Sequence, residues 1–384
     1  MEEYSARGLA ELRRQKKRKR SMLKFLYFIA IVIVILGLYI SKDRWMPSFK
    51  VDNSGYTDDE ITVGSFPLKI AGSTKYKACT LGDRLIVLTD TRRYTYTASG
   101  DTNNVESHSY SNAILKSFDN RTLMYEQNGT SLKVDSKRSV QYEKKMDDPI
   151  YVASLGSNGF TAVITQSDQY VCELHVYDDS GDEIYFRGCS QRITDVVFKA
   201  DCSGCRIISL NVSEGNLVSE ITAVDFDKTE NVWEAGNIAT CPVSAYPYGE
   251  DGLVLFGDTM FACFAGDGTE IMEYPYPGAL IDASCSSAGA VMMFENKERQ
   301  STTLSIITDP ASGGVTEAKL NEKFKHVLAW DDRIYMLSET VLESYGYDGK
   351  AIKALELDQP FSDFEKTGRY VYLEGHRTIE KKEF

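Results

Sequence analysis

The 384-residue sequence lacks the motifs that most often mark an active site. It contains no Gly-x-Ser-x-Gly elbow, no Walker phosphate-binding loop and no His-Glu-x-x-His zinc motif. Its few histidines are His108, His175, His326 and His376. They are isolated along the chain, so they make a poor set of zinc ligands. We therefore expect a protein that is not an enzyme, with no cofactor and no metal ion, although carboxylates brought together by the fold would leave no such motif.

Proline is also scarce, with nine residues, and beyond residue 41 no long stretch repeats its apolar residues at helical spacing. Tyrosine, valine, isoleucine and threonine are common there, and these residues favour strands. The same region has 34 basic and 53 acidic residues. An acidic surface of this kind excludes nucleic acid as a partner. Composition therefore favours a large all-β domain.

Residues 22–40 form a long apolar run in which Lys24 is the only charge. Nineteen residues are close to the length that a helix needs to cross a bilayer. Nine Lys or Arg residues precede or begin the run, against three Glu, so the N-terminus is expected to stay in the cytoplasm. A cleaved signal peptide is the alternative, but no small-x-small cleavage site follows Ile40. The run is therefore predicted to be a transmembrane signal-anchor helix.

This prediction divides the chain into four parts. Residues 1–21 are a basic cytoplasmic tail, 22–40 the helix, 41–60 an acidic linker and 61–384 an extracytoplasmic domain. The linker contains the sequence DNSGYTDDE at 52–60, which superficially resembles a calcium loop. It lacks the alternating oxygen ligands and the closing Glu of an EF-hand, so a linker is the better interpretation. We expect a single-pass protein of the cell membrane.

A hairpin turn recurs along the predicted extracytoplasmic domain. Gly100, Gly181, Gly268 and Gly349 each follow a strand-like run, and they are separated by 81, 87 and 81 residues. Glycine supplies the positive φ that a tight hairpin turn needs. Weaker turns near residues 137, 227 and 313 halve each interval to about 41 residues. Apolar strands precede most of these turns, for example at residues 85–88, 161–164 and 253–256.

A unit of four short strands at this period predicts a β-propeller. The tail from Arg369 supplies two further strands, and the strand-like segment 61–70 could complete the same blade from the other end of the chain. Joining both ends in one blade would remove an open edge. The prediction is an all-β propeller in which eight blades are favoured and seven are possible; a β-solenoid is the rival fold.

One repeat carries a family resemblance. In the sequence AVDFDKTENVW, Ala223, Asp225 and Trp233 match the quinoprotein propeller repeat A-x-D-x-x-T-G-x-x-x-W, while Thr229 is displaced by one residue and the Gly is absent. With its basic tail and apolar run, the chain resembles an uncharacterised Gram-positive (Clostridia-type) family of single-pass membrane proteins with a quinoprotein-like, or PQQ-like, propeller: DUF family 5711. The resemblance implies a fold and not a reaction. The quinone and calcium ligands of quinoproteins cannot be assigned to residues here.

All eight cysteines follow the apolar run, in a compartment where disulfides can form. If Ser180 and Gly181 form a two-residue loop, Cys172 and Cys189 lie opposite one another on its two strands. Cys202 and Cys205 flank Ser203 and Gly204, close enough for a local bridge. Both pairs are candidate disulfides. The Cys-x-x-Cys could instead be redox-active or half of a zinc site, although no second Cys-x-x-Cys is present.

Two segments, AYPYG at 245–249 and YPYPG at 274–278, place tyrosines around a proline. We expect them to be loops between strands, because each follows a hairpin. Tyrosine and proline together suit recognition surfaces. The candidate interaction surface consists of Tyr246, Tyr248, Tyr274 and Tyr276. The alternative is that these rings fill the gap between two blades.

The leading functional hypothesis is a non-catalytic propeller at the outer face of the membrane, which acts as a scaffold for protein interaction or envelope assembly. Its partner would be an envelope protein or a glycan. The lipid-anchored propeller scaffold of Gram-negative outer-membrane protein insertion offers an analogy. One alternative is a receptor for a glycan or another small ligand; a further alternative is a degenerate quinoprotein-like oxidoreductase.

Overall fold

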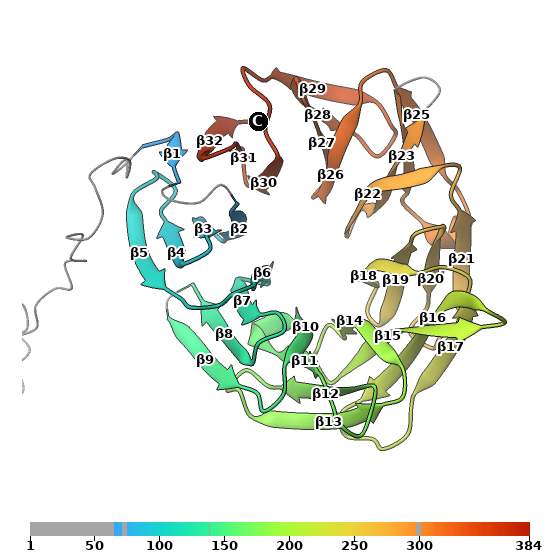
Figure 1. Ribbon diagram of the computed structural model, residues 1–384. Helices are drawn as coiled ribbons and strands as arrows, with labels where there is room; N and C mark the ends of the chain where they lie inside the picture. The colour runs from blue at the N-terminus through green and yellow to red at the C-terminus, as the bar shows by residue number, and fades with distance from the viewer. Residues whose placement is uncertain (1–64, 71–74, 138, 297–300) are drawn as a thin grey trace, which may run out of the picture. The chain divides into compact units, whose positions relative to one another are not determined.

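The computed structural model describes residues 65–70, 75–137, 139–296 and 301–384. These residues form eight antiparallel sheets of four strands, arranged as the blades of a propeller (Figure 1). The predicted tail 1–21, transmembrane helix 22–40 and linker 41–60 lie outside them. Among the residues that the structure describes, no helix is long and apolar enough to cross a membrane.

The first four blades follow one another along the chain. Blade 1 contains β2 (Lys77–Leu81), β3 (Arg84–Leu88), β4 (Arg92–Tyr96) and β5 (Thr102–Ser107). Blade 2 contains β6 (Ala113–Phe118), β7 (Arg121–Glu126), β8 (Ser131–Ser136) and β9 (Val140–Lys145). Blade 3 contains β10 (Ile150–Leu155), β11 (Thr161–Thr165), β12 (Cys172–Tyr177) and β13 (Glu183–Cys189), with the short 3-10 turn η1 (Ser157–Gly159) after β10. Blade 4 contains β14 (Arg192–Phe198), β15 (Gly204–Ser213), β16 (Asn216–Asp225) and β17 (Trp233–Ile238).

The next three blades repeat the pattern. Blade 5 contains β18 (Pro242–Tyr248), β19 (Gly252–Gly257), β20 (Met260–Phe264) and β21 (Glu270–Pro275). Blade 6 contains β22 (Ala279–Ser286), β23 (Gly289–Asn296), β24 (Ser301–Ile307) and β25 (Thr316–Leu320), with η2 (Pro310–Ser312) before β25. Blade 7 contains β26 (Phe324–Trp330), β27 (Arg333–Ser338), β28 (Val341–Tyr345) and β29 (Ala351–Glu356).

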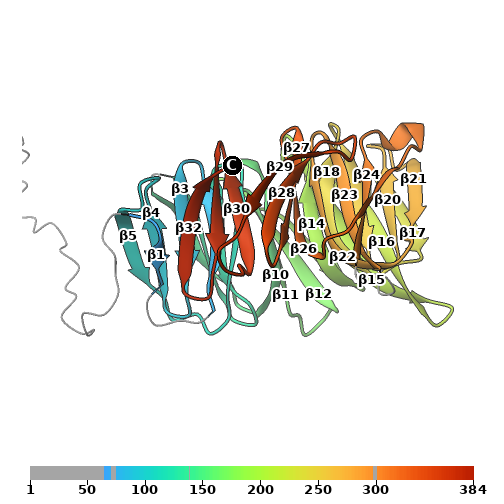
Figure 2. The same ribbon diagram turned by 90° about the horizontal axis from the view of Figure 1, so that it is seen from above.

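Blade 8 is built from both ends of the described chain. Its strands are β30 (Asp363–Thr367), β31 (Tyr370–Glu374), β32 (Thr378–Glu383) and β1 (Leu68–Lys69). Leu68 pairs with Ile379 and Lys69 with Thr378, so β1 is the outermost strand of the blade. The predicted closure by segment 61–70 and the favoured count of eight blades are both confirmed, and Figure 2 shows β1 beside β32.

The hairpin glycines turn the chain from the third to the fourth strand of alternate blades. Gly100, Gly181, Gly268 and Gly349 have φ of 93°, 83°, 86° and 77°. Each donates its backbone N–H to the carbonyl three residues earlier, at 2.9–3.1 Å. The weaker turns near residues 137, 227 and 313 occupy the same place in blades 2, 4 and 6. The period seen in the sequence is therefore one blade.

The core lies between the blades. Each of the eight blade-to-blade interfaces holds one cluster of buried apolar side chains. In the interface between blades 8 and 1, for example, Leu68 and Tyr372 pack with Leu85. The second and third strands of a blade have neighbours on both faces, so β11 and β20 are buried throughout. This is why their sequences are continuous apolar runs and do not alternate.

Candidate functional site

The four tyrosines of the predicted interaction surface all belong to blade 5, and three of them lie on its strands. Tyr246 and Tyr248 lie on β18, the innermost strand of blade 5, whereas Tyr274 lies on the outermost strand β21 and Tyr276 directly follows it. The prediction that they lie in loops is wrong for Tyr246, Tyr248 and Tyr274, and it is right for Tyr276. All four are half-buried and pack against the core cluster between blades 5 and 6. The ring centroid of Tyr276, for instance, is 4.9 Å from that of Phe294 in blade 6.

The proline in each segment is compatible with a strand because both prolines lie on strands at the edge of their sheet. Pro247 lies in an innermost strand and Pro275 ends an outermost one. Proline lacks a backbone N–H, and such strand positions leave one edge without a ladder partner, so it is tolerated there. The alternative that the rings fill the gap between two blades agrees with this placement. Partner binding by these tyrosines stays a prediction.

Cys172 and Cys189 lie directly opposite one another on β12 and β13. The turn between them differs from the expected one: Gly181 donates to the carbonyl of Asp178, so the loop begins earlier than Ser180. A β-bulge next to this turn shifts the register by one residue and restores the predicted pairing. Because the two thiols share a hydrogen bond, the pKa of Cys172 falls to about 7 and that of Cys189 rises.

Cys202 and Cys205 lie at the interface between blades 3 and 4. The N–H of Cys202 donates to the carbonyl of Lys199, so Cys202 is part of the turn itself, with φ of 57°. Cys205 pairs with Phe198 within the sheet. The predicted turn at Ser203 is therefore displaced toward the N-terminus. All eight cysteines are free thiols in the structure, and both bridges stay predictions for the oxidised protein.

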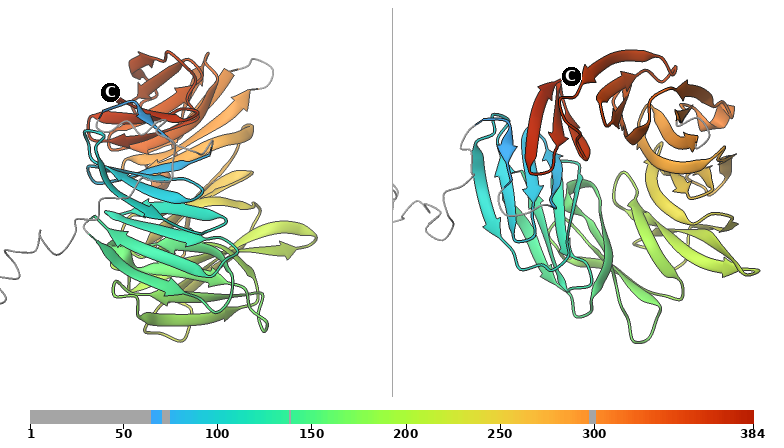
Figure 3. Two further views of the ribbon diagram at one scale, coloured as in Figure 1. Left: turned by 60° about the vertical axis from the view of Figure 1, so that its left-hand side comes forward. Right: turned by 45° about the horizontal axis from the view of Figure 1, so that its top comes forward.

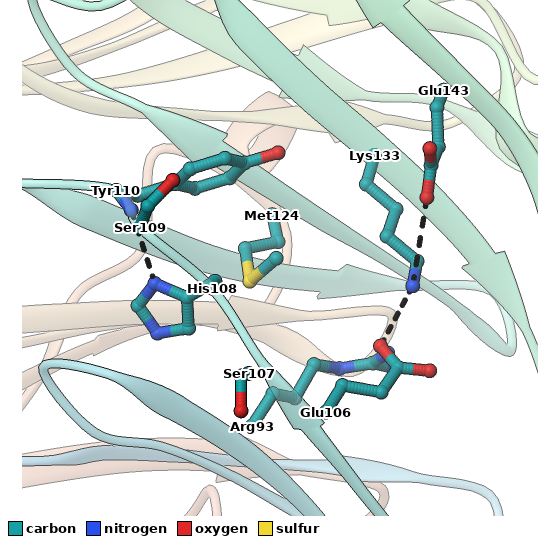
Figure 4. A pocket seen from close by; sticks show the side chains of 9 residues that line it. All are labelled: Arg93, Glu106, Ser107, His108, Ser109, Tyr110, Met124, Lys133 and Glu143. Carbon is teal, nitrogen blue, oxygen red and sulfur yellow. Dashed lines mark hydrogen bonds and ion pairs between the residues drawn. The ribbon is translucent and has the colours of Figure 1, made fainter.

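A groove of about 470 Å³ lies between the outer parts of blades 1 and 2 (Figure 4). Its lining residues are Arg93, Glu106, Ser107, His108, Ser109, Tyr110, Met124, Lys133 and Glu143. His108 accepts a hydrogen bond at Nδ1 from the N–H of Tyr110, so its Nε2 carries the proton that is donated to the Thr89 carbonyl at 2.9 Å. These two hydrogen bonds fix the orientation of the imidazole ring.

Ion pairs across the blade interface form the floor of this groove. Arg93 lies 2.8 Å from Asp135, and the Lys133 ammonium donates to Glu106 at 2.7 Å. Burial acts to raise the pKa of Glu106, but the hydrogen bond and charge of Lys133, with the charge of Arg93, outweigh it and lower that pKa. Burial dominates at Asp135 and raises its pKa. Since each cation faces a carboxylate, the groove suits a neutral polar ligand better than an ion.

Exposed apolar side chains are concentrated on blades 3 and 4. Eleven large hydrophobic residues are exposed in the part of the chain that the structure describes. Seven of them lie in these two blades: Tyr170, Val171, Ile184, Phe186, Val212, Leu217 and Val232. Single exposed apolar residues are normal, whereas a contiguous apolar patch marks an interaction surface, so these two blades are the candidate surface.

Part of this surface is a projecting hairpin. β15 and β16 have ten residues each, against eight or fewer in every other described strand, so their ends extend beyond the neighbouring blades. Figure 3 shows this yellow-green hairpin projecting from the propeller in both views. Val212 and Leu217 pair across its tip, and they are 61% and 51% exposed. The turn residues Glu214 and Gly215 both have positive φ, which fits a two-residue hairpin loop.

Blade 8 brings together three carboxylates that no sequence motif indicates. Asp363 lies opposite Glu374 in the sheet, and Glu365 is two residues along β30. Burial, followed by the charges of neighbouring carboxylates, raises the pKa of Glu365 and of Glu374 to about 8. The pairing of β30 with β31 creates this cluster, because it sets Glu374 directly opposite Asp363. Among the described residues, no group of three or more His, Cys, Asp or Glu side chains could hold a metal ion.

Comparisons with known proteins agree on the fold. The model of a family of unknown function, DUF5711, matches residues 53–380. No curated protein is similar enough in sequence to count as a relative.

Several solved structures are similar in shape. BamB from Moraxella catarrhalis is 11% identical, with a TM-score of 0.55, over 80% of this chain and 96% of BamB. Sqt1 from Saccharomyces cerevisiae is 8% identical, with a TM-score of 0.60, over 85% of this chain and 99% of Sqt1. A quinohemoprotein alcohol dehydrogenase from Pseudomonas putida is 9% identical, with a TM-score of 0.53, over 79% of this chain and 70% of the enzyme. At such identities the likeness concerns the propeller fold alone.

Proposed function

The chain belongs to the DUF5711 family of unknown function, whose model covers residues 53–380, and from this premise we propose that it is a protein-interaction scaffold. The scaffold is held at the outer face of the cell membrane by the apolar segment 22–40. It acts by binding envelope proteins and carries out no catalytic step.

The observation that carries the proposal is the concentration of exposed apolar side chains on blades 3 and 4. Water around such side chains is released when a partner covers them, and this release drives association. The projecting tip with Val212 and Leu217 extends the surface outward from the ring. A rigid propeller loses little conformational entropy when it binds, which favours the role of a platform.

The membrane location rests on the sequence. Segment 22–40 has the length and composition of a transmembrane helix, and the basic residues before it favour a cytoplasmic N-terminus. The propeller then lies outside the cytoplasm, where an acidic surface remains soluble beside an anionic membrane.

Site-specific cross-linking tests the scaffold. A photo-cross-linking amino acid is placed at Phe186, at Leu217 and, as a control, at Ile352, which is 51% exposed on blade 7. We expect one common protein to cross-link at Phe186 and Leu217 and not at Ile352. Recovery of this protein by the full-length chain should fall about tenfold in the double variant Phe186→Lys, Leu217→Lys, at an unchanged melting temperature. Equal cross-linking at Ile352, or recovery that the double variant leaves intact, would contradict the proposal.

The groove between blades 1 and 2 favours a second function, binding of a neutral saccharide. Its volume suits a small polar ligand, and Tyr110 offers an aromatic face among hydrogen-bonding groups. Calorimetry against a panel of neutral oligosaccharides tests this idea, with Tyr110→Ser and Glu143→Gln as the weakened variants and Glu356→Gln as the control. A failure of every oligosaccharide to bind would exclude this second function without affecting the scaffold.

A further inference from the structure

We propose that β13, the outer strand of blade 3, binds an extended segment of a partner protein as an additional strand of its sheet. The inference rests on the proposed scaffold function and names how the partner docks. In this mode the backbone N–H and C=O groups on the free edge of β13 bond to the incoming segment, while side chains beside that edge select its sequence.

Among the outer strands that the structure describes, β13 combines exposed large apolar side chains with an absence of lysine. Sheet order β10-β11-β12-β13 leaves its outer edge without a strand partner among the described residues. Proteins usually protect such an edge with lysines or with a short strand. β9, β25 and β29 follow this rule, since each carries at least one lysine. β5, β17 and β21 also lack lysine, but they expose no large hydrophobic side chain. β13 has seven residues and no lysine, and it exposes Ile184 and Phe186.

A row of apolar side chains runs along one face of β13. Phe186 is 52% exposed, and its ring lies 5.1 Å from that of His175 on the adjacent strand β12. Two residues further along, Gly188 is covered by the ring of Tyr170: a Cβ at Gly188 would lie 2.4 Å from a ring carbon. The absence of a side chain at Gly188 therefore allows the Tyr170 ring to lie over β13, on the face that also carries Phe186. Ile184 continues the row toward the turn.

The turn at the start of β13 is acidic. Asp178 uses its carboxylate within the turn, where it accepts hydrogen bonds from the N–H groups of Ser180 and Asp182 at 2.9 Å. Asp179 and Asp182 are exposed. A lysine or arginine in the partner would therefore be attracted to this end of the strand. The ligand that fits is an extended segment with apolar side chains toward Ile184, Phe186 and Tyr170 and a basic residue near Asp182.

A second copy of this chain fits less well than such a segment. The residues beyond the apolar run are strongly acidic, and two copies would repel one another at neutral pH. A partner with basic residues is attracted by the same negative charge. Self-association remains an outcome that the experiment must report.

The probe is a fluorescent ten-residue peptide of alternating valine and lysine, titrated against the purified full-length chain. Two control peptides carry N-methyl groups on all valines or on all lysines. Each set of methyl groups removes the hydrogen-bond donors from one edge of the peptide, and only one edge can face β13. Strand addition therefore predicts that the two methylated peptides differ in affinity by about tenfold or more. Attraction between charges alone predicts equal affinities, because the three peptides have the same charge.

Two protein variants complete the test. Phe186→Lys should weaken binding of the unmethylated peptide about tenfold, whereas Ile352→Lys on β29 adds the same charge elsewhere and should leave it unchanged. If Phe186→Lys melts at a lower temperature, Ile184→Lys replaces it. Light scattering of the chain without peptide reports self-association.

Three results would overturn the inference: no saturable binding up to about 1 mM, equal affinities of the methylated peptides, or a dimer that Phe186→Lys dissociates. The scaffold proposal fails separately, by the loss of specific cross-links at Phe186 and Leu217. Cross-links that persist without peptide binding would keep the scaffold and exclude strand addition.

Discussion

The burial of a tyrosine in this propeller depends more on its neighbours in space than on the residues beside it in the sequence. Tyr246 has its ring 5.7 Å from Phe256, edge to face, and burial raises its pKa. Tyr170 lies in the connection between β11 and β12, and it is exposed. Both have local sequences that suit a surface. Their different burial follows from which blade interface each one meets.

Replacing the four tyrosines of blade 5 tests their role. The variant with Tyr246, Tyr248, Tyr274 and Tyr276 changed to Ser should lose several kcal/mol of unfolding free energy, because half-buried rings leave the core between blades 5 and 6. Thermal and urea unfolding measure the loss. Tyr170→Ser serves as the control and should change stability by about 0.5 kcal/mol or less. An unchanged melting temperature with lost partner binding would restore the predicted aromatic interaction surface.

Oxidation should link two pairs of cysteines. The Cys172 thiol, with its pKa lowered to about 7, ionises near neutral pH and faces Cys189 directly. We expect a Cys172–Cys189 bridge, and a Cys202–Cys205 bridge across the turn, in protein from the extracytoplasmic side. Each should add at most about 2 kcal/mol of stability. Non-reducing mass spectrometry, with a reduced sample as control, measures them; free thiols at all four positions would refute the prediction.

The carboxyl of Glu374 should make stability depend on pH. It is 5% exposed, and burial with the charges of Asp363 and Glu365 raises its pKa to about 8. In the unfolded chain this pKa is about 4.3. Between about pH 4.3 and pH 8 the folded state therefore binds a proton that the unfolded state has released. The stabilisation is complete below about pH 4 and is lost as the pH rises through 8. Urea unfolding between pH 5 and 9 should show this fall, and Glu374→Gln should reduce it, whereas Glu356→Gln on the exposed strand β29 should leave it unchanged.

At the scale of the elements, β1 has an effect out of proportion to its length. It has only two residues, yet Leu68 is buried to 1% exposure in the cluster that joins blades 8 and 1. Two backbone pairs with β32 and one buried side chain thus close the ring. The segment 61–70 was correctly predicted to complete the last blade, because its strand-like pattern had no partner at its own end of the chain.

Shortening the Leu68 side chain measures how much this closure contributes to stability. Leu68→Ala should lower the unfolding free energy by about 3 kcal/mol, since it removes a buried side chain from an interface that cannot fully collapse. Lys69→Ala, next to it on the exposed face, should have little effect. Urea unfolding gives both values. A Leu68→Ala variant as stable as the parent would mean that β1 does not close the propeller.

Contacts between neighbouring blades stabilise the propeller. Only the contact that closes the ring joins blades that are far apart in the sequence. Seven of the eight interfaces join consecutive blades, and the eighth joins blade 8 to blade 1. The ring therefore leaves no blade without neighbours on both sides. This arrangement presents outer strands such as β13 around the rim, where a partner can reach them.

The orientation of the complete chain can be tested on intact cells or spheroplasts. We predict that an external protease removes the region beyond residue 41, while a tag at Met1 stays protected, because the basic residues hold the N-terminus inside. Immunoblots of both ends, with lysed cells as the control, give the result. Digestion of the Met1 tag from outside, or release of a mature form that lacks it, would refute the single-pass topology.

The sequence by itself determined the propeller and its period. A glycine with positive φ at Gly100, Gly181, Gly268 and Gly349 is a local requirement of a tight turn, so it is visible without the structure. Continuous apolar strands such as β11 and β19 are visible for the same reason, because burial on both faces leaves no polar position. The register of Cys172 and Cys189 was also predicted, although the turn that produces it was not.

Only the tertiary structure decided which surfaces are free. Tyr246 and Phe186 are both aromatic residues of strands, but the former meets blade 6 and the latter lies beside an open edge. The carboxylates of blade 8 and the ion pairs between Arg93 and Asp135 likewise depend on strand pairing and blade packing. Exposure and charge pairing depend on how strands pair and how blades pack, and the composition of a single segment does not reveal those contacts.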